Sequence, residues 1–293
     1  MGEKVRTDVS GHSNEELGML YFYGLKLGFR FLWRGKTNKE LLAIPVSYWR
    51  ALEYKIVFNE LKPDPADRIL DIGSPKLLSL FLADKIGCEV YTTDIDDYFI
   101  DDYLFFQSIK GRSTRKLHAV VVDGRKLAFS DNQFTKVYSI SVVEHIPGNG
   151  DTECLKEIAR VLAPNGRCIK TVPFAPESRI DFKDENFYWS KFSVKDPETG
   201  RIFFQRRYSE NDLYKRLIDP SGLRAIKINY IGEKIMTKSS KELCEVLHPI
   251  TGPIQPMLSI LFLSKPKRSW KELKKPLCAV LVLEKSQGAG LGS

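Results

Sequence analysis

The sequence predicts an α/β protein built on a doubly wound, mostly parallel sheet. Three observations support this fold class. Short β-rich runs alternate with helical segments from Arg68 onward, and parallel strands need crossover connections of that length. Pro63 and Pro65 mark a boundary just before the first of these runs. The chain has 293 residues, and its 43% hydrophobic content is enough to fill a sizeable core.

The segment before the two prolines predicts a helical cap. Its hydrophobic pattern predicts helices over 15–33 and 46–61. In the first of these, Lys26, Arg30 and Arg34 recur every four residues on one face, while aromatic and aliphatic residues crowd the others. The N-terminal helix is therefore expected to be basic and amphipathic.

Five parallel strands are expected after the boundary. Strands are predicted at 68–72, 89–93, 117–122, 136–141 and 167–172, and helices between them at 75–86, 97–110 and 151–162. Ser74 is predicted to cap the first of these helices, with Pro75 in its first turn. Right-handed crossovers between the strands would give a sheet with helices on both faces.

The C-terminal part has a less regular pattern. An aromatic hairpin is predicted from 186–194 and 201–208, followed by a helix that Ser209 opens. Two late strands are predicted at 224–230 and 277–284, as an antiparallel pair at the sheet edge. The connection between them is too long for a plain loop, so an inserted helical flap is expected there.

These elements predict a domain organisation in three parts. The helical cap covers residues 1–65, the sheet domain covers 66–285, and 286–293 form a tail. The sheet domain would include the aromatic hairpin, 174–208, and the helical insertion, 231–276.

Composition narrows the class of protein. The five cysteines are scattered without metal-ligand spacing, which fits reduced thiols in a cytosol and indicates no metal. No signal-peptide pattern and no long uncharged apolar stretch is present, so a cytoplasmic location is expected. The net charge of +8 is spread along the chain and does not by itself identify a partner.

Acidic residues follow the predicted strands where each strand ends. Asp71 lies near the end of the first strand, and Asp94 and Asp123 follow the second and third strands. Ligands of such sheets bind outside the carboxyl ends of the strands. The chain has no glycine-rich G-x-G-x-x-G turn after Gly73, so a pyrophosphate-binding cofactor is disfavoured. Asp94 is placed to accept both hydroxyls of a ribose, although a solvated loop acid or a helix cap is the alternative for each carboxylate.

The same region resembles the class I S-adenosylmethionine-dependent methyltransferases of the small-molecule type, with a type 11-like domain. The resemblance spans about 68–174. It depends on five motifs in order, namely Ile69 to Gly73, Asp94, Asp123 to Phe129, Val142 to Ile146 and Glu157 to Gly166. It implies a Rossmann-like, seven-stranded sheet, mostly parallel with an antiparallel last strand, and S-adenosylmethionine as cofactor.

The resemblance also implies a set of cofactor-binding residues. Asp71, Gly73 and Ser74 would border the methionine part, Asp94 and Ile95 the ribose, Asp123 and Gly124 the adenine, and Ile140 and Ser141 the end of the fourth strand. The family's second and third glycines are replaced here by Pro75 and Leu77. A catalytically degenerate binding protein with this fold therefore stays open, as does a nucleic-acid methyltransferase favoured by the basic charge.

The catalytic and acceptor residues are less sharply indicated. His145 follows the fourth strand and has a side chain suited to proton removal at neutral pH, but a structural role for it is the alternative. Aromatic and basic residues of the hairpin region are candidates to contact an apolar or lipid-like acceptor, or to pack the hairpin on the sheet. They are Phe174, Tyr188, Trp189, Phe203, Arg206 and Tyr208.

Two basic, apolar segments raise the alternative of a membrane-surface partner. One is the N-terminal helix, and the other is the apolar run 256–263, which Lys265, Lys267 and Arg268 follow. The competing interpretation is a lid that closes over the cofactor, or a dimer face.

Overall fold

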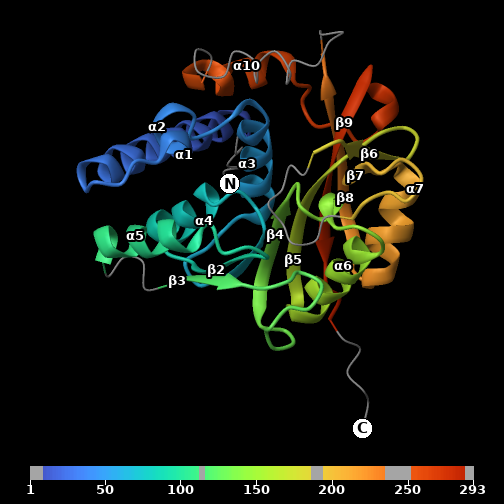
Figure 1. Ribbon diagram of the computed structural model, residues 1–293, viewed down its shortest axis with the longest axis horizontal. Helices are drawn as coiled ribbons and strands as arrows, with labels where there is room; N and C mark the ends of the chain where they lie inside the picture. The colour runs from blue at the N-terminus through green and yellow to red at the C-terminus, as the bar shows by residue number, and fades with distance from the viewer. Residues whose placement is uncertain (1–8, 112–115, 186–193, 235–251, 288–293) are drawn as a thin grey trace, which may run out of the picture. The chain divides into compact units, whose positions relative to one another are not determined.

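The computed structural model describes residues 9–111, 116–185, 194–234 and 252–287 (Figure 1). These residues belong to two compact units. The first contains 9–59 and 252–261, and the second contains the remaining described residues.

The first unit is helical. Its elements are α1 (Val9–Trp33), α2 (Lys39–Ala43), α3 (Tyr48–Leu61), a 3-10 turn (Gly252–Ile254) and α10 (Gln255–Phe262). The helices predicted at 15–33 and 46–61 are confirmed, and α1 begins six residues earlier than expected. The Tyr48 N–H donates to Gln255 Oε1 at 2.9 Å, so α10 packs with helices far from it in the sequence. Residues 235–251 of the predicted insertion lie outside the described residues.

The second unit contains the predicted seven-stranded sheet. Its strands are β1 (Arg68–Ile72), β2 (Glu89–Asp94), β3 (Leu117–Val121), β4 (Phe134–Ile140), β5 (Leu162–Pro173), β8 (Arg224–Glu233) and β9 (Lys275–Glu284). Their order across the sheet is β3-β2-β1-β4-β5-β9-β8, and β9 is antiparallel to both neighbours. The predicted fold class, with an antiparallel last strand, is confirmed.

Helices cover both faces of this sheet. They are α4 (Leu77–Phe81), which continues as a π-helix (Leu82–Ile86), α5 (Ile100–Lys110), α6 (Gly150–Val161), and α7 (Glu210–Asp212), which continues as a π-helix (Leu213–Ile218). Short 3-10 turns occur at Val143–His145, Asp219–Ser221 and Trp270–Glu272. Figure 1 shows α4 and α5 on one side of the sheet and α6 and α7 on the other, as a doubly wound fold requires.

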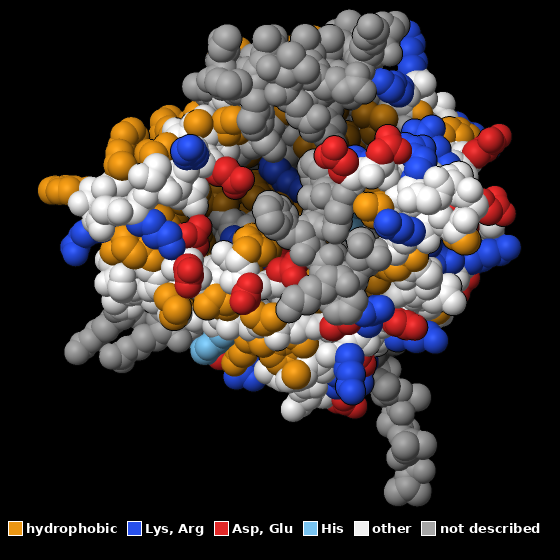
Figure 2. Space-filling model, in the orientation of Figure 1, with side chains coloured by type: hydrophobic (Ala, Val, Ile, Leu, Met, Phe, Trp, Pro, Cys, Tyr) orange, Lys and Arg blue, Asp and Glu red, His pale blue; other side chains and the backbone are white. Residues whose placement is uncertain are grey.

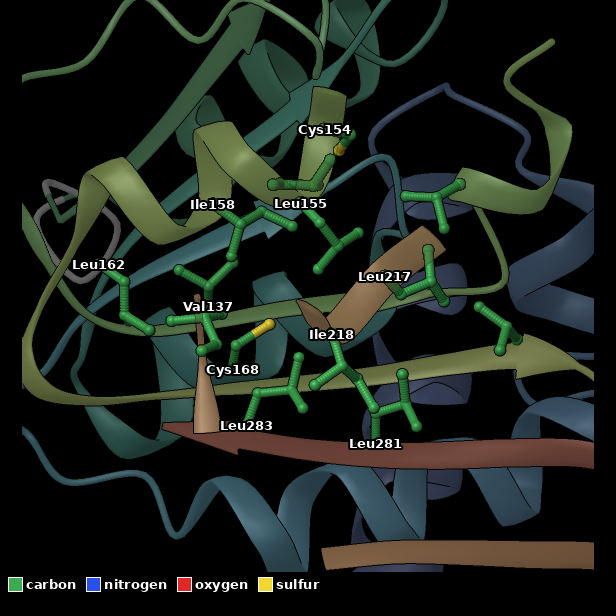
Figure 3. Close-up of a cluster of buried hydrophobic side chains, with 14 of the residues drawn as sticks. Val137, Cys154, Leu155, Ile158, Leu162, Cys168, Leu217, Ile218, Leu281 and Leu283 are labelled. Atoms are coloured by element: carbon green, nitrogen blue, oxygen red, sulfur yellow. The ribbon is translucent and has the colours of Figure 1, made fainter. Parts of the chain in front are cut away.

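The main core lies between α6, the 213–218 helix and the sheet (Figure 3). In α6, Cys154, Leu155 and Ile158 recur at helical spacing and are fully buried against the β5 residue Cys168. Each such side chain contributes about 1.5–3 kcal/mol by leaving water. Burial raises the pKa of the Cys154 thiol to about 11 and that of Cys168 to about 12, so both are protonated at neutral pH.

Two local predictions differ from the structure. Ser74 does not cap the helix after β1, because its buried hydroxyl accepts the Ile140 N–H instead, and the N-cap residue is Lys76. The strand that pairs along β7 (Ile202–Arg207) is β6 (Arg179–Lys183), upstream of the predicted one. The predicted hairpin turn is nevertheless present, since the Phe203 N–H donates to the Val194 carbonyl at 2.9 Å. Residues 186–193 of that predicted strand lie outside the described residues.

Candidate cofactor and acceptor site

The sheet order brings the predicted cofactor residues to one edge. β1, β2, β3 and β4 are neighbours and parallel, so their carboxyl ends meet at the same edge. The chain winds outward in opposite directions from β1 and β4, and the crevice at such a switch point is where ligands bind in open α/β sheets. The predicted residues follow these four strands.

The turn after β1 depends on Gly73. Its φ of +62° lies in the left-handed region, and an added Cβ would come within 2.7 Å of Val142 Cγ1. Its N–H donates to the Thr93 carbonyl at 2.9 Å. The Ser74 hydroxyl, which accepts the Ile140 N–H at 2.9 Å, links the same turn to the end of β4. The backbone therefore crosses tightly between β1, β2 and β4, with no room for a side chain at this point.

Asp71 holds this turn from inside. Its carboxylate is fully buried and accepts hydrogen bonds from the Ser74 N–H at 3.2 Å, from Thr92 Oγ1 at 2.9 Å and from Ser79 Oγ. Burial raises the pKa of the Asp71 carboxyl group. Asp71 therefore shapes the turn through its hydrogen bonds, with its carboxylate directed into the protein.

Asp94 lies nearer the surface and already has several donors. Its carboxylate accepts from the Ile95 N–H at 2.9 Å, from Lys76 Nζ at 3.0 Å and from the Tyr98 hydroxyl at 3.2 Å. Lys76 Nζ also donates to the Thr93 carbonyl at 3.0 Å. A carboxylate can accept about four hydrogen bonds, and the three donors named above already occupy most of these positions. To accept both hydroxyls of a ribose, Asp94 would therefore have to release Lys76 or Tyr98.

The turn after β3 pairs a carboxylate with a small residue. Arg125 donates to Asp123 through Nε at 3.0 Å and Nη2 at 2.7 Å, and these hydrogen bonds lower the pKa of Asp123. A Cβ on Gly124 would come within 3.2 Å of Cys154 Sγ. The Asp123 carboxylate is thus fixed, ionised and about a third exposed.

The end of β4 has an unusual backbone. Ser141 has a φ of +51°, which side-chain-bearing residues rarely adopt, and its N–H donates to the Thr171 carbonyl at 3.2 Å. Ile140 is fully buried. Such backbone conformations are concentrated at functional sites, because the surrounding structure must hold them.

Together these residues fit a nucleoside cofactor that carries positive charge. Two carboxylates, Asp94 and Asp123, lie at the ends of adjacent strands, and Gly73 and Gly124 allow the turns beside them to pack closely on Val142 and Cys154. Among the described residues, no group of three or more His, Cys, Asp or Glu side chains is arranged to hold a metal ion.

His145 lies in the 3-10 turn after β4. Its Nδ1 is 2.7 Å from the Phe204 carbonyl, which can only accept, so Nδ1 carries the hydrogen. Its Nε2 lies 3.8 Å from Oε1 of the buried Glu144. The ring therefore connects the β4 end to the β6–β7 hairpin, and its second nitrogen faces a carboxylate.

Three of the predicted acceptor residues are buried. Phe174 and Tyr208 are 1% and 0% exposed, and Phe174 packs its ring 4.8 Å from that of Tyr230. Arg206 is 8% exposed and donates to Asp151 at 3.1 Å. These side chains thus make contacts within the protein.

Asp151, at the start of α6, is the centre of that arrangement. Its fully buried carboxylate accepts hydrogen bonds from Arg206, from the Tyr208 hydroxyl at 3.0 Å and from Arg216 Nε at 2.9 Å. Both arginines also donate to the Gly148 carbonyl. The sequence predicts Asp151 only as the first residue of a helix, because its partners come 55 to 65 residues later.

The remaining acceptor candidates divide into two groups. Phe203 is half-buried on β7, with its ring 6.4 Å from that of Phe182 on β6. Tyr188 and Trp189 lie outside the described residues.

An open hollow lies beyond the ends of β5 and β7. It is lined by Pro176, Ser209, Glu210, Asn211, Tyr214 and Trp270. Its volume of about 530 Å³ suits a small molecule. Glu210 accepts hydrogen bonds there from Trp270 Nε1 at 3.0 Å and from the Tyr230 hydroxyl at 3.3 Å. The hairpin pattern does not point to Trp270, which lies far from the hairpin in the sequence, or to Tyr214, which belongs to the helix that follows it.

The family match agrees with this geometry. Residues 70–170, from β1 into β5, match the family model described as a methyltransferase domain. With the sheet order and the strand-end residues, this match identifies residues 70–170 as a methyltransferase domain. No curated protein matches the chain.

Solved structures share the fold at low sequence identity. The [4+2]-cyclase SpnF is 16% identical, with a TM-score of 0.52 and 82% of each chain covered. The geranyl diphosphate C-methyltransferase of Streptomyces coelicolor is 11% identical, with a TM-score of 0.50 and coverage of 80% of this chain and 77% of that one. The 1,6-didemethyltoxoflavin-N1-methyltransferase of Burkholderia thailandensis is 13% identical, with a TM-score of 0.50 and coverage of 95% and 91%.

Proposed function

We propose that the protein transfers the methyl group of S-adenosylmethionine to a small apolar or aromatic acceptor, with a lipid-like molecule included in that class. One observation carries this proposal. The Gly73 turn, Asp94, Asp123 and the Ser141 backbone follow four neighbouring parallel strands and meet at one edge of the sheet.

The cofactor would bind across this edge. Asp94 and Ile95 would hold the ribose, Asp123 and Gly124 the adenine, and the end of β4 would lie beneath the sulfur. The turn that Asp71, Gly73 and Ser74 form would border the methionine part. The positive sulfonium favours this acidic edge, where a phosphate would be repelled.

The acceptor would enter on the β5 side of the cofactor. The hollow lined by Tyr214 and Trp270 supports this, because aromatic walls suit a planar or apolar molecule and Glu210 offers carboxylate oxygens. The half-exposed Phe203 on the hairpin is a further candidate for contact. Neighbours of the same fold act on geranyl diphosphate and on 1,6-didemethyltoxoflavin, so the fold accommodates both apolar and planar acceptors.

Methyl transfer from a sulfonium is an in-line displacement, and positioning supplies much of such catalysis. We assign His145 a positioning role, since its Nδ1–H donates to Phe204 and so fixes the hairpin over the end of β4. Proton removal by His145 would require Nε2 to turn from Glu144 toward the acceptor. His145→Asn separates the two roles: a pH–rate profile that loses its ascending limb would assign the base, and an unchanged profile would assign positioning.

Calorimetric titration with S-adenosylmethionine and S-adenosylhomocysteine tests the cofactor, with NAD as control. Saturable binding of both adenosyl ligands and no binding of NAD is expected. Absence of adenosyl binding in a folded protein would contradict the proposal and favour a degenerate binding protein.

The acceptor pocket is tested separately with a naphthol probe. Trp270→Ala should weaken naphthol binding while leaving cofactor affinity unchanged, because Trp270 lines the hollow and is not one of the proposed cofactor-binding residues. Leu104→Ala, an exposed apolar residue of α5, is the matched control. Equal naphthol affinity in the wild type and Trp270→Ala would place the acceptor elsewhere.

A further inference from the structure

Helix α1 exposes an apolar stripe on the face opposite its packed side. Its buried face consists of Leu20, Tyr23, Leu27 and Phe31, at helical spacing. The other face carries Met19, Phe22, Phe29 and Trp33, which are 51%, 61%, 63% and 90% exposed. Among the described residues of the unit, the first face is buried by packing, so the exposed second face needs a different explanation.

The exposed stripe is basic as well as apolar. Lys26 and Arg30 lie between its apolar residues and Arg34 follows it, and all three are exposed. Residues 17–39 contain five basic residues and no acidic one. Figure 2 shows hydrophobic and basic side chains next to each other over the part of the surface where Figure 1 draws α1. Lysine and arginine beside exposed aromatic rings are typical of helices that lie in a membrane interface.

A second helix of the same unit adds exposed apolar surface. Met257 in α10 is 65% exposed, and Ile254 just before it is 48% exposed. Helix α10 contains no charged residue. No described helix is long and apolar enough to cross a bilayer, so contact with lipid would be limited to the surface.

We propose that the exposed face of α1 binds the surface of an anionic phospholipid membrane. The apolar side chains of Phe22, Phe29 and Trp33 would enter the headgroup region, and Lys26 and Arg30 would contact lipid phosphates. A second copy of the chain is a poorer occupant, because a symmetric contact through this stripe would set its basic residues against one another. Anionic headgroups supply the opposite charge.

Vesicle flotation with the full chain tests this. Vesicles of phosphatidylcholine with phosphatidylglycerol should retain the protein, and phosphatidylcholine alone should retain on the order of tenfold less, because each basic residue contributes to binding an anionic surface. Phe29→Ser with Trp33→Ser, and separately Lys26→Glu with Arg30→Glu, should each abolish retention. Leu104→Ser, an exposed apolar change in α5, is the matched control and should retain wild-type binding.

Trp33 also gives a direct spectroscopic signal. Its indole is 90% exposed, so its emission should shift to shorter wavelength when anionic vesicles are added, and Trp33→Phe should remove that shift. No anionic preference in flotation, or a sedimenting dimer that Phe29→Ser disrupts without any vesicle binding, would overturn the proposal. The α1 variants lie far from the cofactor residues in sequence and are expected to bind S-adenosylmethionine normally. Loss of vesicle binding would therefore say nothing against the cofactor proposal, and loss of cofactor binding would say nothing against membrane binding.

Discussion

Two carboxylates of the sheet unit, Asp94 and Asp151, are both surrounded by donors but differ in how they are held. The Asp151 carboxylate is fully buried and bound by two arginines and a tyrosine from distant segments. The Asp94 side chain is 13% exposed, and two of its donors are the long side chains of Lys76 and Tyr98. A buried carboxylate with fixed donors is costly to remove, because its partners would be left buried and unpaired, whereas a carboxylate with exchangeable donors can bind a ligand.

The largest expected effect is on the free energy of unfolding and concerns Asp151. Asp151→Ala leaves Arg206 and Arg216 without their shared carboxylate, one of them buried. Breaking such a pair costs about 3–5 kcal/mol. Urea denaturation should show this loss in the free energy of unfolding.

The matched control is Asp131→Ala, which removes an ion pair with Arg160 from a 70% exposed carboxylate. It should cost less than about 1 kcal/mol. Equal losses in the two variants would show that Asp151 is not the centre of a buried network.

The second effect concerns the turn that holds the cofactor edge. Gly73→Ala places a side chain at a φ of +62° and a Cβ within 2.7 Å of Val142 Cγ1. Together these should cost about 2–4 kcal/mol of unfolding free energy. Gly87→Ala has a φ of +88° but nothing within 4 Å, so it isolates the backbone cost. If thermal unfolding shows the same loss for both, the close contact with Val142 is unimportant.

The third effect is on the affinity for S-adenosylmethionine and concerns Asp94. Asp94→Ala should weaken S-adenosylmethionine binding by about 1.5–3 kcal/mol, since it removes a charged acceptor from the ribose hydroxyls. The loss of stability should be smaller than in Asp151→Ala, because the Asp94 side chain is 13% exposed and that of Asp151 is 0% exposed. Asp97→Ala removes the same charge from an exposed position three residues later and should bind the cofactor normally. Wild-type affinity in Asp94→Ala, measured by calorimetry, would refute the ribose assignment.

The difference between the two carboxylates also explains what could be predicted from sequence. Asp94 and the Gly73 turn directly follow strands whose positions the hydrophobic pattern gives, so local rules locate them. The partners of Asp151, such as Arg206, come from contacts across more than 50 residues, which no local pattern contains. Arg206 and Tyr208 therefore resembled ligand-binding residues in the sequence, although in the folded chain they bind Asp151.

The smallest expected effect concerns Lys76, which the sequence did not single out, and the relative affinity of the site for two ligands. Lys76 neutralises Asp94 and brings a positive charge to the proposed ribose position. S-adenosylmethionine has a positive sulfonium, whereas S-adenosylhomocysteine has a neutral sulfur, so a nearby cation disfavours the first ligand relative to the second. Lys76→Met should therefore improve binding of S-adenosylmethionine relative to S-adenosylhomocysteine by a few-fold.

The measurement is the ratio of the dissociation constants of the two ligands. In Lys76→Met an Asp94 oxygen becomes free for the ribose, and this increases the affinity for both ligands equally, so it cancels in the ratio. Lys116→Met is the control, since Lys116 precedes β3 at the opposite edge of the sheet and donates to the Gly87 carbonyl. An unchanged ratio in Lys76→Met would mean that Lys76 moves away from Asp94 when the cofactor binds. A changed ratio would show that the lysine stays beside the bound ligand, and the Asp94 donors would then be only partly exchangeable.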